Sequence, residues 1–407
     1  TPLTAADPVV SNRTQDGAIS VPTGGNLMVS LAADNAAAGT IADGSAYNKV
    51  LKLNLSANTL TQVTGITLTK TGLIANSNIS GVSVWDAQGN RHGEVMSSLT
   101  ADNKVTISFG SNPITVGAGS TESLTVAVNI ANMTNGSGLV GFNVAAASDI
   151  MSNGTVSGAF PIMGNQMNIV EGSASLASTT VSAVAVGGAS SATLAAGNLQ
   201  IGDMQKEVAK FRFTENSGNE DVALAKITFY VEGSVQDSDL ANWSLYAPNG
   251  DKLAMTAAMS NRYVTLNLAT PYLIPKGTSK EVTLKVDVVN GSSHTFRVHL
   301  QSDYDVMLQG KTSGFYVLPA SFSDTFSAGT GWFAMGSGSL VLNKTANSPA
   351  GNVSAGSQNI VLARFDAKAT GEDLEVRKMG LTVTKATVSN VNLTGNVSVR
   401  DATDGTV

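Results

Sequence analysis

The sequence carries an internal repeat, which limits the folds open to a chain of 407 residues. Residues 204–253 hold two short apolar runs in period two around a polar, acidic turn, followed by a run that ends in an aromatic residue before a tight turn. Related patterns occupy residues 50–89 and 365–405, and Gly250 follows Gly89 by 161 residues. This period has the length of a whole β-sandwich, so each copy is expected to have its own core.

Each copy consists of short runs of alternating or β-branched apolar residues, bounded by Gly, Asn, Asp or Pro, which is typical of sandwich strands. The runs are residues 50–55, 66–69, 82–85, 105–109 and 124–130 in the first copy, and 211–213, 227–229, 243–246, 263–268 and 282–288 in the second. Charged residues make up only 13% of the chain, which disfavours surface helices. We predict an all-β fold of tandem β-sandwich modules, arranged as beads on a string.

The repeat also predicts the domain boundaries. Residues 1–24 are expected to form an extended N-terminal arm, residues 25–172 and 173–325 two sandwich modules, and residues 326–407 the first half of a third module. Half a sandwich exposes apolar strand edges. Either the polypeptide continues beyond Val407, or another subunit supplies the missing strands through an arm such as residues 1–24. Because the chain starts at Thr1 without a signal peptide, we expect a processed mature form or a fragment.

Composition excludes several classes of function. The net charge of −6 forms no basic stripe, so no nucleic-acid partner is expected. The absence of cysteine excludes disulfides, thiolate metal sites and cysteine nucleophiles. No run of 18 apolar residues occurs, so no transmembrane segment is expected.

Catalytic motifs are also missing from the sequence. His294 and His299 are five residues apart in a strand-like run, which places them on opposite faces, and with His92 they are expected to be solvated strand residues. No Gly-x-Ser-x-Gly elbow lies between a strand and a helix. We predict that the protein is not an enzyme and has no catalytic residues.

Acidic loop residues are the one chemical signal in the sequence. Carboxylates are the hard oxygen ligands that Ca²⁺ prefers, and the candidate metal ligands are Asp237, Asp239, Asp303 and Asp305. The pairs Glu220–Asp221 and Glu372–Asp373 are of the same kind. None of these matches an EF-hand loop, and solvated turn carboxylates are the competing interpretation. Ca²⁺ at module junctions is the hypothesis.

Aromatic residues at repeat positions could form either module cores or a sugar-stacking platform, and their place inside strands favours cores. They are Trp85, Trp243, Phe211, Phe213, Phe229 and Tyr246. Trp332 differs because it lies in a Gly-rich junction, where it could pack between modules or subunits. Trp332 and the arm residues Thr1, Pro2 and Leu3 are the candidate assembly residues.

The motifs AKFRFTENSGNEDVALAKITF and LARFDAKATGEDLEVRKMGLTV, with an IPKGTSKEVTLKVDV strand, resemble the tandem immunoglobulin-like modules of prokaryotic S-layer and secreted cell-surface proteins. The first module fits loosely, because its VLKLNLSANTLTQVTGITLT lacks the Glu-Asp pair. The resemblance implies a secreted, extracellular structural protein that self-associates, with Ca²⁺ at module junctions. No surface-layer anchor motif is seen.

We therefore predict an extracellular protein that assembles with itself into a cell-surface array (S-layer), a filament or a sheath. Few charges with abundant Thr, Asn and Ser suit close packing of like subunits. The alternative is a cell-surface adhesin or glycan-binding protein of the same modules. In either case cell-wall glycan is a candidate partner.

Overall fold

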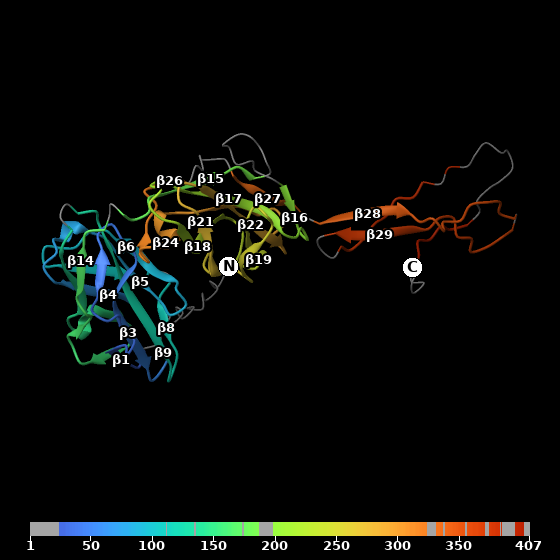
Figure 1. The fold of residues 1–407 in the computed structure, drawn as a ribbon. Coiled ribbons are helices and arrows are strands. Elements are labelled where there is room, and N and C mark those ends of the chain that lie inside the picture. The colour runs from blue at the N-terminus through green and yellow to red at the C-terminus, as the bar shows by residue number, and fades with distance from the viewer. Residues whose placement is uncertain are drawn as a thin grey trace, which may run out of the picture. The chain divides into compact units, whose positions relative to one another are not determined.

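In a computed structural model, the chain is described over residues 24–402, apart from 111, 134–135, 173–174, 187–197, 324–330, 337, 355, 371–373, 383 and 385–394. The chain divides into two compact units near residue 340. Unit 1 contains two β-sandwiches, and unit 2 contains the two-stranded sheet β28-β29 (Figure 1).

The first sandwich packs one sheet against another. Its first sheet has the order β12-β1-β3-β9-β5-β6, with bounds β12 Thr155–Gly158, β1 Asn26–Leu31, β3 Asn48–Ala57, β9 Thr121–Ile130, β5 Ile79–Trp85 and β6 Arg91–Met96. Its second sheet has the order β11-β4-β10-β14-β2, and β13, β7 and β8 pair with its strands. Their bounds are β11 Ile150–Ser152, β4 Thr61–Thr71, β10 Gly138–Val144, β14 Met167–Val170, β2 Thr40–Ala42, β13 Ile162–Met163, β7 Lys104–Ser108 and β8 Ile114–Val116. The 3₁₀ turns η1 (Asn76–Asn78) and η2 (Ala147–Asp149) precede β5 and β11.

The second sandwich has the same layers. Its first sheet has the order β20-β19-β22-β17-β15-β26, with bounds β20 Lys252–Thr256, β19 Leu240–Tyr246, β22 Ser279–Val288, β17 Lys206–Glu215, β15 Thr179–Val184 and β26 Ser321–Ser323. Its second sheet has the order β16-β27-β23-β18-β24-β25, with β21 on β18. The bounds are β16 Asn198–Gln200, β27 Phe333–Gly336, β23 Thr295–His299, β18 Val222–Gly233, β24 Val306–Gly310, β25 Tyr316–Val317 and β21 Tyr263–Ile274. The 3₁₀ turn η4 (Asp303–Asp305) precedes β24.

The strand orders of the two first sheets correspond strand for strand, and the second sheets share most of their strands. In each first sheet the two central strands pair antiparallel across a bulge, between Lys49 and Leu51 in β3 and between Glu207 and Ala209 in β17. In each, the outermost strand, β12 or β26, joins its neighbour in parallel. In each second sheet a short parallel pair closes one edge, β14 with β2 and β27 with β16. The sequence repeat is therefore a repeat of topology.

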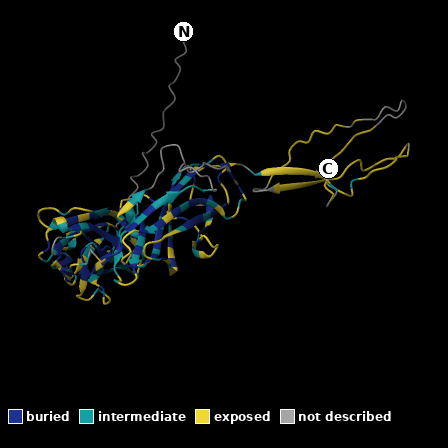
Figure 2. Cartoon of the chain, turned by 45° about the horizontal axis from the view of Figure 1, so that its top comes forward, coloured by how far each residue is buried: buried dark blue, intermediate teal, exposed yellow. Residues whose placement is uncertain are grey.

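Alternating apolar residues explain the cores. Inward-facing side chains of β3, such as Leu53 and Leu55, are fully buried in the first core. In the second core Phe211 and Phe229 lie with their ring centroids 5.8 Å apart, and Trp243 is fully buried. Figure 2 shows buried residues throughout both sandwiches. The predicted fold class, an all-β chain of tandem immunoglobulin-like β-sandwiches, is confirmed.

Unit 2 holds β28 (Ser339–Lys344) and β29 (Phe365–Thr370). Its large apolar side chains are exposed, among them Leu342 at 46% and Phe365 at 51%. Unit 2 lies in the segment predicted as half a module, and the predicted domain boundaries stay predictions. Within the described ranges, no helix is long and apolar enough to cross a membrane.

Candidate functional site

The first and second sandwiches, both in unit 1, meet at a buried contact, which we call the joint. On the first sandwich it consists of Ala46, Tyr47, Trp85, Gly89, Arg91 and Ala127, and on the second of Lys226, Tyr304, Asp305, Met307 and Tyr316. The backbone N–H of Ala46 donates to the carbonyl of Tyr316 at 2.8 Å. This forms an isolated antiparallel bridge between the sandwiches.

Tyr47 is the polar centre of the joint. Its hydroxyl donates to the backbone carbonyl of Tyr304 at 3.0 Å, and the hydroxyl of Tyr304 donates back to the carbonyl of Ser80 at 3.4 Å. Burial raises the pKa of Tyr47 well above its ordinary value, so this hydroxyl stays protonated and remains a donor. Two reciprocal hydrogen bonds thus cross the joint.

The aromatic rings pack at the same place. Tyr47 meets Trp85 edge to face with ring centroids 5.7 Å apart, and meets Tyr316 at 6.2 Å. Edge-to-face pairs of this kind are favourable beyond the area that they bury. Ala127 completes the cluster with a side chain small enough to leave room for these rings.

Lys226 of β18 enters the joint from the second sandwich. Its ammonium group lies 4.6 Å from the centre of the Trp85 ring and donates to the carbonyl of Gly89. Gly89 sits in the turn after β5 with a φ of 79°, a conformation that glycine adopts at little cost. Burial lowers the pKa of Lys226 to about 8, although the charges of Asp86 and Asp305 act in the opposite direction.

A charged pair borders the lysine. Arg91 of β6 lies 3.7 Å from a carboxylate oxygen of Asp305, whose side chain is buried. Burial raises the pKa of Asp305, while the Arg91 charge and two backbone N–H donors lower it. The joint therefore holds a buried lysine and a buried carboxylate, each with partners from the other sandwich or from its own loop.

Asp43 fixes the start of the connector between the sandwiches. Its fully buried carboxylate accepts hydrogen bonds from the backbone N–H of Gly172 at 2.6 Å and of Met133 at 2.9 Å. The preceding residue, Ala42, belongs to the core cluster of the second sandwich, as does Leu176. The connector is thereby tied to both sandwiches.

The predicted calcium ligands do not converge. Asp239 is buried, accepts from the backbone N–H of Gln236 at 2.7 Å and lies 2.7 Å from Nδ1 of His294. Asp237, two residues earlier, instead accepts from the backbone N–H of Asn261 at 3.0 Å. The two carboxylates thus serve different loops.

The second predicted pair belongs to η4. Asp305 accepts from the backbone N–H groups of Gln301 and Ser302, at 2.8 and 3.0 Å, and Asp303 accepts from the Ser302 hydroxyl at 3.2 Å. No metal-binding group of three or more His, Cys, Asp or Glu side chains lies among the described residues. Ca²⁺ stays a prediction.

Other acidic side chains hold loops. Glu220 is buried and accepts from the backbone N–H groups of Thr312 and Ser313, both at 2.9 Å. Glu215 accepts from the N–H groups of Gly218 and Gly277, at 2.8 and 2.7 Å. Although burial alone would raise the pKa of Glu215, these hydrogen bonds and those from Ser217 lower it. A carboxylate in such a place substitutes for missing backbone partners. Glu372 and Asp373 lie outside the described residues.

The histidines do not meet one another, as predicted, but two of them are not solvated. His92 is 7% exposed, between the Asn112 carbonyl at 3.0 Å and Asp86 at 3.3 Å. The side chain of His299 is 14% exposed and its ring packs on Tyr230. Strand alternation predicts only on which face of a sheet a residue lies. Neighbouring side chains cover the outward face at His92 and His299, so both rings are largely buried.

The aromatic residues divide into two groups. Trp243, Phe211, Phe213 and Phe229 are core residues, as predicted. Trp85 and Tyr246 point out of the sandwich cores instead, because each is the last residue of its strand and lies on the outer face of the first sheet. Trp85 lies in the joint. The Tyr246 ring centre lies 5.2 Å from the Lys285 ammonium. Trp332 packs against Arg297 at 5.1 Å within the second sandwich. Thr1, Pro2 and Leu3 lie outside the described residues.

Sequence reasoning missed Lys226 and Tyr47. The available signal was a lysine inside the apolar run VALAKITF of a chain poor in charge. A charged residue in a buried strand needs a partner, which here comes from another sandwich.

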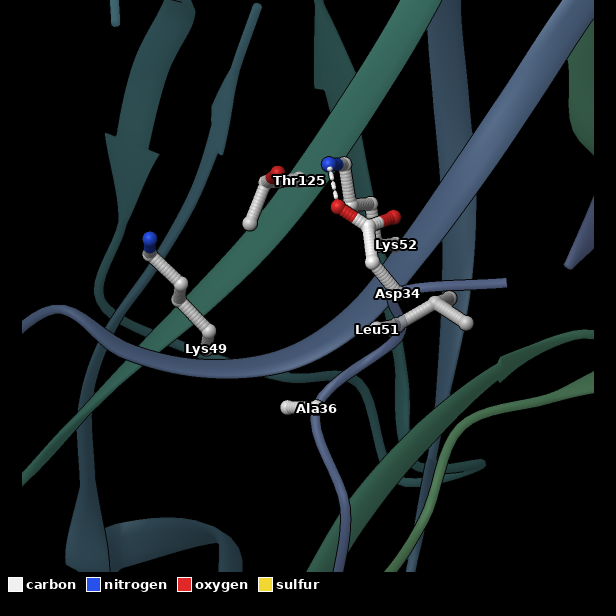
Figure 3. A pocket seen from close by; sticks show the side chains of 6 residues that line it. All are labelled: Asp34, Ala36, Lys49, Leu51, Lys52 and Thr125. Atoms are coloured by element: carbon white, nitrogen blue, oxygen red, sulfur yellow. Dashed lines mark hydrogen bonds and ion pairs between the residues drawn. The ribbon is translucent and has the colours of Figure 1, made fainter. Parts of the chain in front are cut away.

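A shallow hollow of about 140 Å³ lies on the outer face of the first sheet (Figure 3). It is lined by Asp34, Ala36, Lys49, Leu51, Lys52 and Thr125, and the Lys52 ammonium donates to Asp34. Pockets for small ligands usually enclose about 300–1,000 Å³. The hollow therefore offers less enclosure than a typical ligand pocket.

No family model matches the sequence, and no curated protein is similar to it. Solved structures that resemble the chain include the C-terminal domain of the antigen I/II polypeptide BspA of Streptococcus agalactiae, with 8% identity, 76% of this chain and 99% of that chain covered, and a TM-score of 0.20. The C-terminal domain of the Streptococcus pyogenes antigen I/II-family protein AspA has 9% identity, the same coverage and a TM-score of 0.19. A partial N-terminal region of an enterococcal surface protein has 10% identity, 73% and 95% coverage and a TM-score of 0.18. At these TM-scores the likeness carries no argument about function.

Proposed function

We propose that the chain is an extracellular structural protein that assembles with itself into a cell-surface array or filament. The joint is the observation that carries this proposal. It holds two whole domains together through a backbone bridge, reciprocal tyrosine hydrogen bonds and a buried lysine. Such a contact makes two domains one stiff unit, which an array or a fibre requires of its subunits.

Composition supports the same proposal. With 13% charged residues, copies of the chain can pack closely with little repulsion between like charges. The main partner is then the chain itself, with cell-wall glycan as a second candidate partner. Location at the cell surface and Ca²⁺ at the module junctions belong to this proposal.

Electron microscopy of the purified full chain over a concentration series tests the proposal, with Ca²⁺ and with EGTA. We expect ordered sheets or filaments at high concentration. Monomers under every condition would contradict self-assembly and favour an adhesin, which glycan-array binding would then test. Assembly and thermal stability that are the same in EGTA as in Ca²⁺ would rule out the calcium hypothesis alone.

A further inference from the structure

The joint has two complementary sides, and each sandwich carries a counterpart of both. We call the side on the first sandwich, formed by Ala46, Tyr47, Trp85 and Gly89, a trailing face, and the side on the second, formed by Lys226, Tyr304, Asp305 and Met307, a leading face. Strand register identifies the counterparts. They are a trailing face on the second sandwich and a leading face on the first.

The trailing face of the second sandwich contains Met204, Gln205, Tyr246 and Gly250. Tyr47 and Gln205 share a left-handed backbone, with φ of 54° and 49°. Their N–H groups donate to equivalent side chains, Asn129 and Asp287, each at 2.7 Å. The two faces therefore have the same backbone construction.

The trailing face of the second sandwich is exposed to solvent. Met204, which takes the place of Ala46, is 72% exposed. A side chain added at Gly250 would meet nothing within 4 Å, whereas one added at Gly89 would meet the Lys226 ammonium at 3.9 Å. Methionine and aromatic side chains are enriched at contact surfaces between proteins.

The leading face of the first sandwich contains Gly65, Ser148, Asp149 and Met151. Gly65 pairs with Met151 across β4 and β11 as Lys226 pairs with Met307 across β18 and β24. Met307 packs into the joint, but its counterpart Met151 is 38% exposed. Each free face thus presents an exposed methionine where the joint buries a residue.

The charges of the two free faces complement each other. Lys252 and Lys285 lie over the Tyr246 ring, at 5.7 and 5.2 Å, so this trailing face carries two lysines where that of the first sandwich has the neutral Ala127. Glu207, 3.4 Å from the Lys285 ammonium, offsets part of this charge. The free leading face has Gly65 in place of Lys226 and keeps an acidic residue, Asp149, in place of Asp305. In the joint the lysine, Lys226, belongs to the leading face, whereas on the free faces the lysines, Lys252 and Lys285, belong to the trailing face.

We propose that copies of the chain associate head to tail, with the trailing face of the second sandwich of one copy against the leading face of the first sandwich of the next. This inference rests on the proposed self-assembly and names the surfaces that perform it. The contact is heterologous, so it repeats from copy to copy and builds a filament or a ring.

Two charge insertions on the full chain test the proposal: Met204→Glu blocks the trailing face and Met151→Lys blocks the leading face. Both positions are exposed, so the sandwiches are expected to fold, which circular dichroism checks. Sedimentation velocity over a concentration series should show association weakened at least 100-fold in each variant, because each inserted charge would be buried against a charge of its own sign, Asp149 for Met204→Glu and Lys285 for Met151→Lys. Met163→Lys and Leu273→Glu, at exposed positions of 53% and 44%, are the matched controls and should assemble like the original chain.

Mixing the two variants gives the sharpest readout. Each variant keeps one intact face, so an equimolar mixture should form dimers that do not extend. Variants that assemble normally, or a mixture that stays monomeric while the original chain assembles, would overturn the head-to-tail contact and leave self-assembly standing. An original chain that remains monomeric at every concentration would overturn both.

Discussion

At the scale of single residues, the joint depends on polar groups that are buried only because another sandwich covers them. Lys226 is 6% exposed and Tyr47 is 4% exposed. Each finds its acceptor in a backbone carbonyl of the other sandwich, at Gly89 and Tyr304. Loss of the contact would return both side chains to water, where their pKa values are ordinary.

Lys226 makes stability depend on pH. Its pKa is about 8 in the folded protein and 10.5 in the unfolded chain, so between these values the unfolded chain binds more protons and stability rises with pH. We expect the free energy of unfolding to gain about 2 kcal/mol from this lysine between pH 7 and 9.5. Urea unfolding at both pH values gives the free energy of unfolding of the original chain and of Lys226→Met, and we expect the gain between the two pH values to be larger in the original chain.

The variant is the control, because it keeps the apolar stem and lacks the titrating group. Tyr47, whose pKa is raised, contributes stability that is lost above its ordinary value of 10.0, so the comparison stays below that pH. An equal pH dependence in both proteins would show that Lys226 does not titrate as expected.

At the scale of elements, short strands complete each second sheet at one edge. β27 pairs in parallel with β16 and antiparallel with β23, and the Phe333 ring stacks on Phe296 with centroids 5.4 Å apart. The sequence places both strands in Ser-, Ala- and Gly-rich stretches, where apolar alternation is weak. Val181 of β15 and Val29 of β1 hold equivalent places in the two sandwiches, opposite Phe213 and Leu55.

A shortened chain tests the predicted module boundary at residue 325. A chain ending there lacks Phe333 and Met335, which are 5% and 2% exposed. We expect the second sandwich to lose at least about 3 kcal/mol of unfolding free energy, as for removal of large core side chains. A chain ending at residue 338 keeps β27 and is the comparison in urea unfolding. Equal stabilities would support the boundary at 325.

At the scale of the whole molecule, the joint couples two domains that each have a separate core. The core clusters of the two sandwiches are distinct, and the joint cluster of Ala46, Tyr47, Trp85 and Ala127 lies outside both. Domains with a buried contact unfold together when the contact is strong relative to their difference in stability.

Trp85→Ala should uncouple the two sandwiches. The change removes the ring that packs on Tyr47 and Lys226, so we expect the coupling to fall by about 3 kcal/mol. Calorimetry of the dilute variant should then resolve a separate unfolding transition for each sandwich, whereas the original chain should give a single transition. Tyr246→Ala, at the equivalent position of the second sandwich, should leave the coupling intact. Loss of coupling in both variants would argue against a specific role of the joint.

The sequence by itself determined the tandem repeat, the all-β class and most of the core, because strand alternation and turn residues are local patterns. Phe211, Phe229 and Trp243 were assigned to the core on that basis, correctly. Only the tertiary structure decided the joint. Its hydrogen bond from Tyr47 to Tyr304 joins residues that are 257 positions apart in the sequence. Its side chains project from the outer faces of strands, where strand alternation predicts exposure to solvent. Trp85 was therefore assigned to a core by pattern, whereas side chains of both sandwiches bury it in the joint.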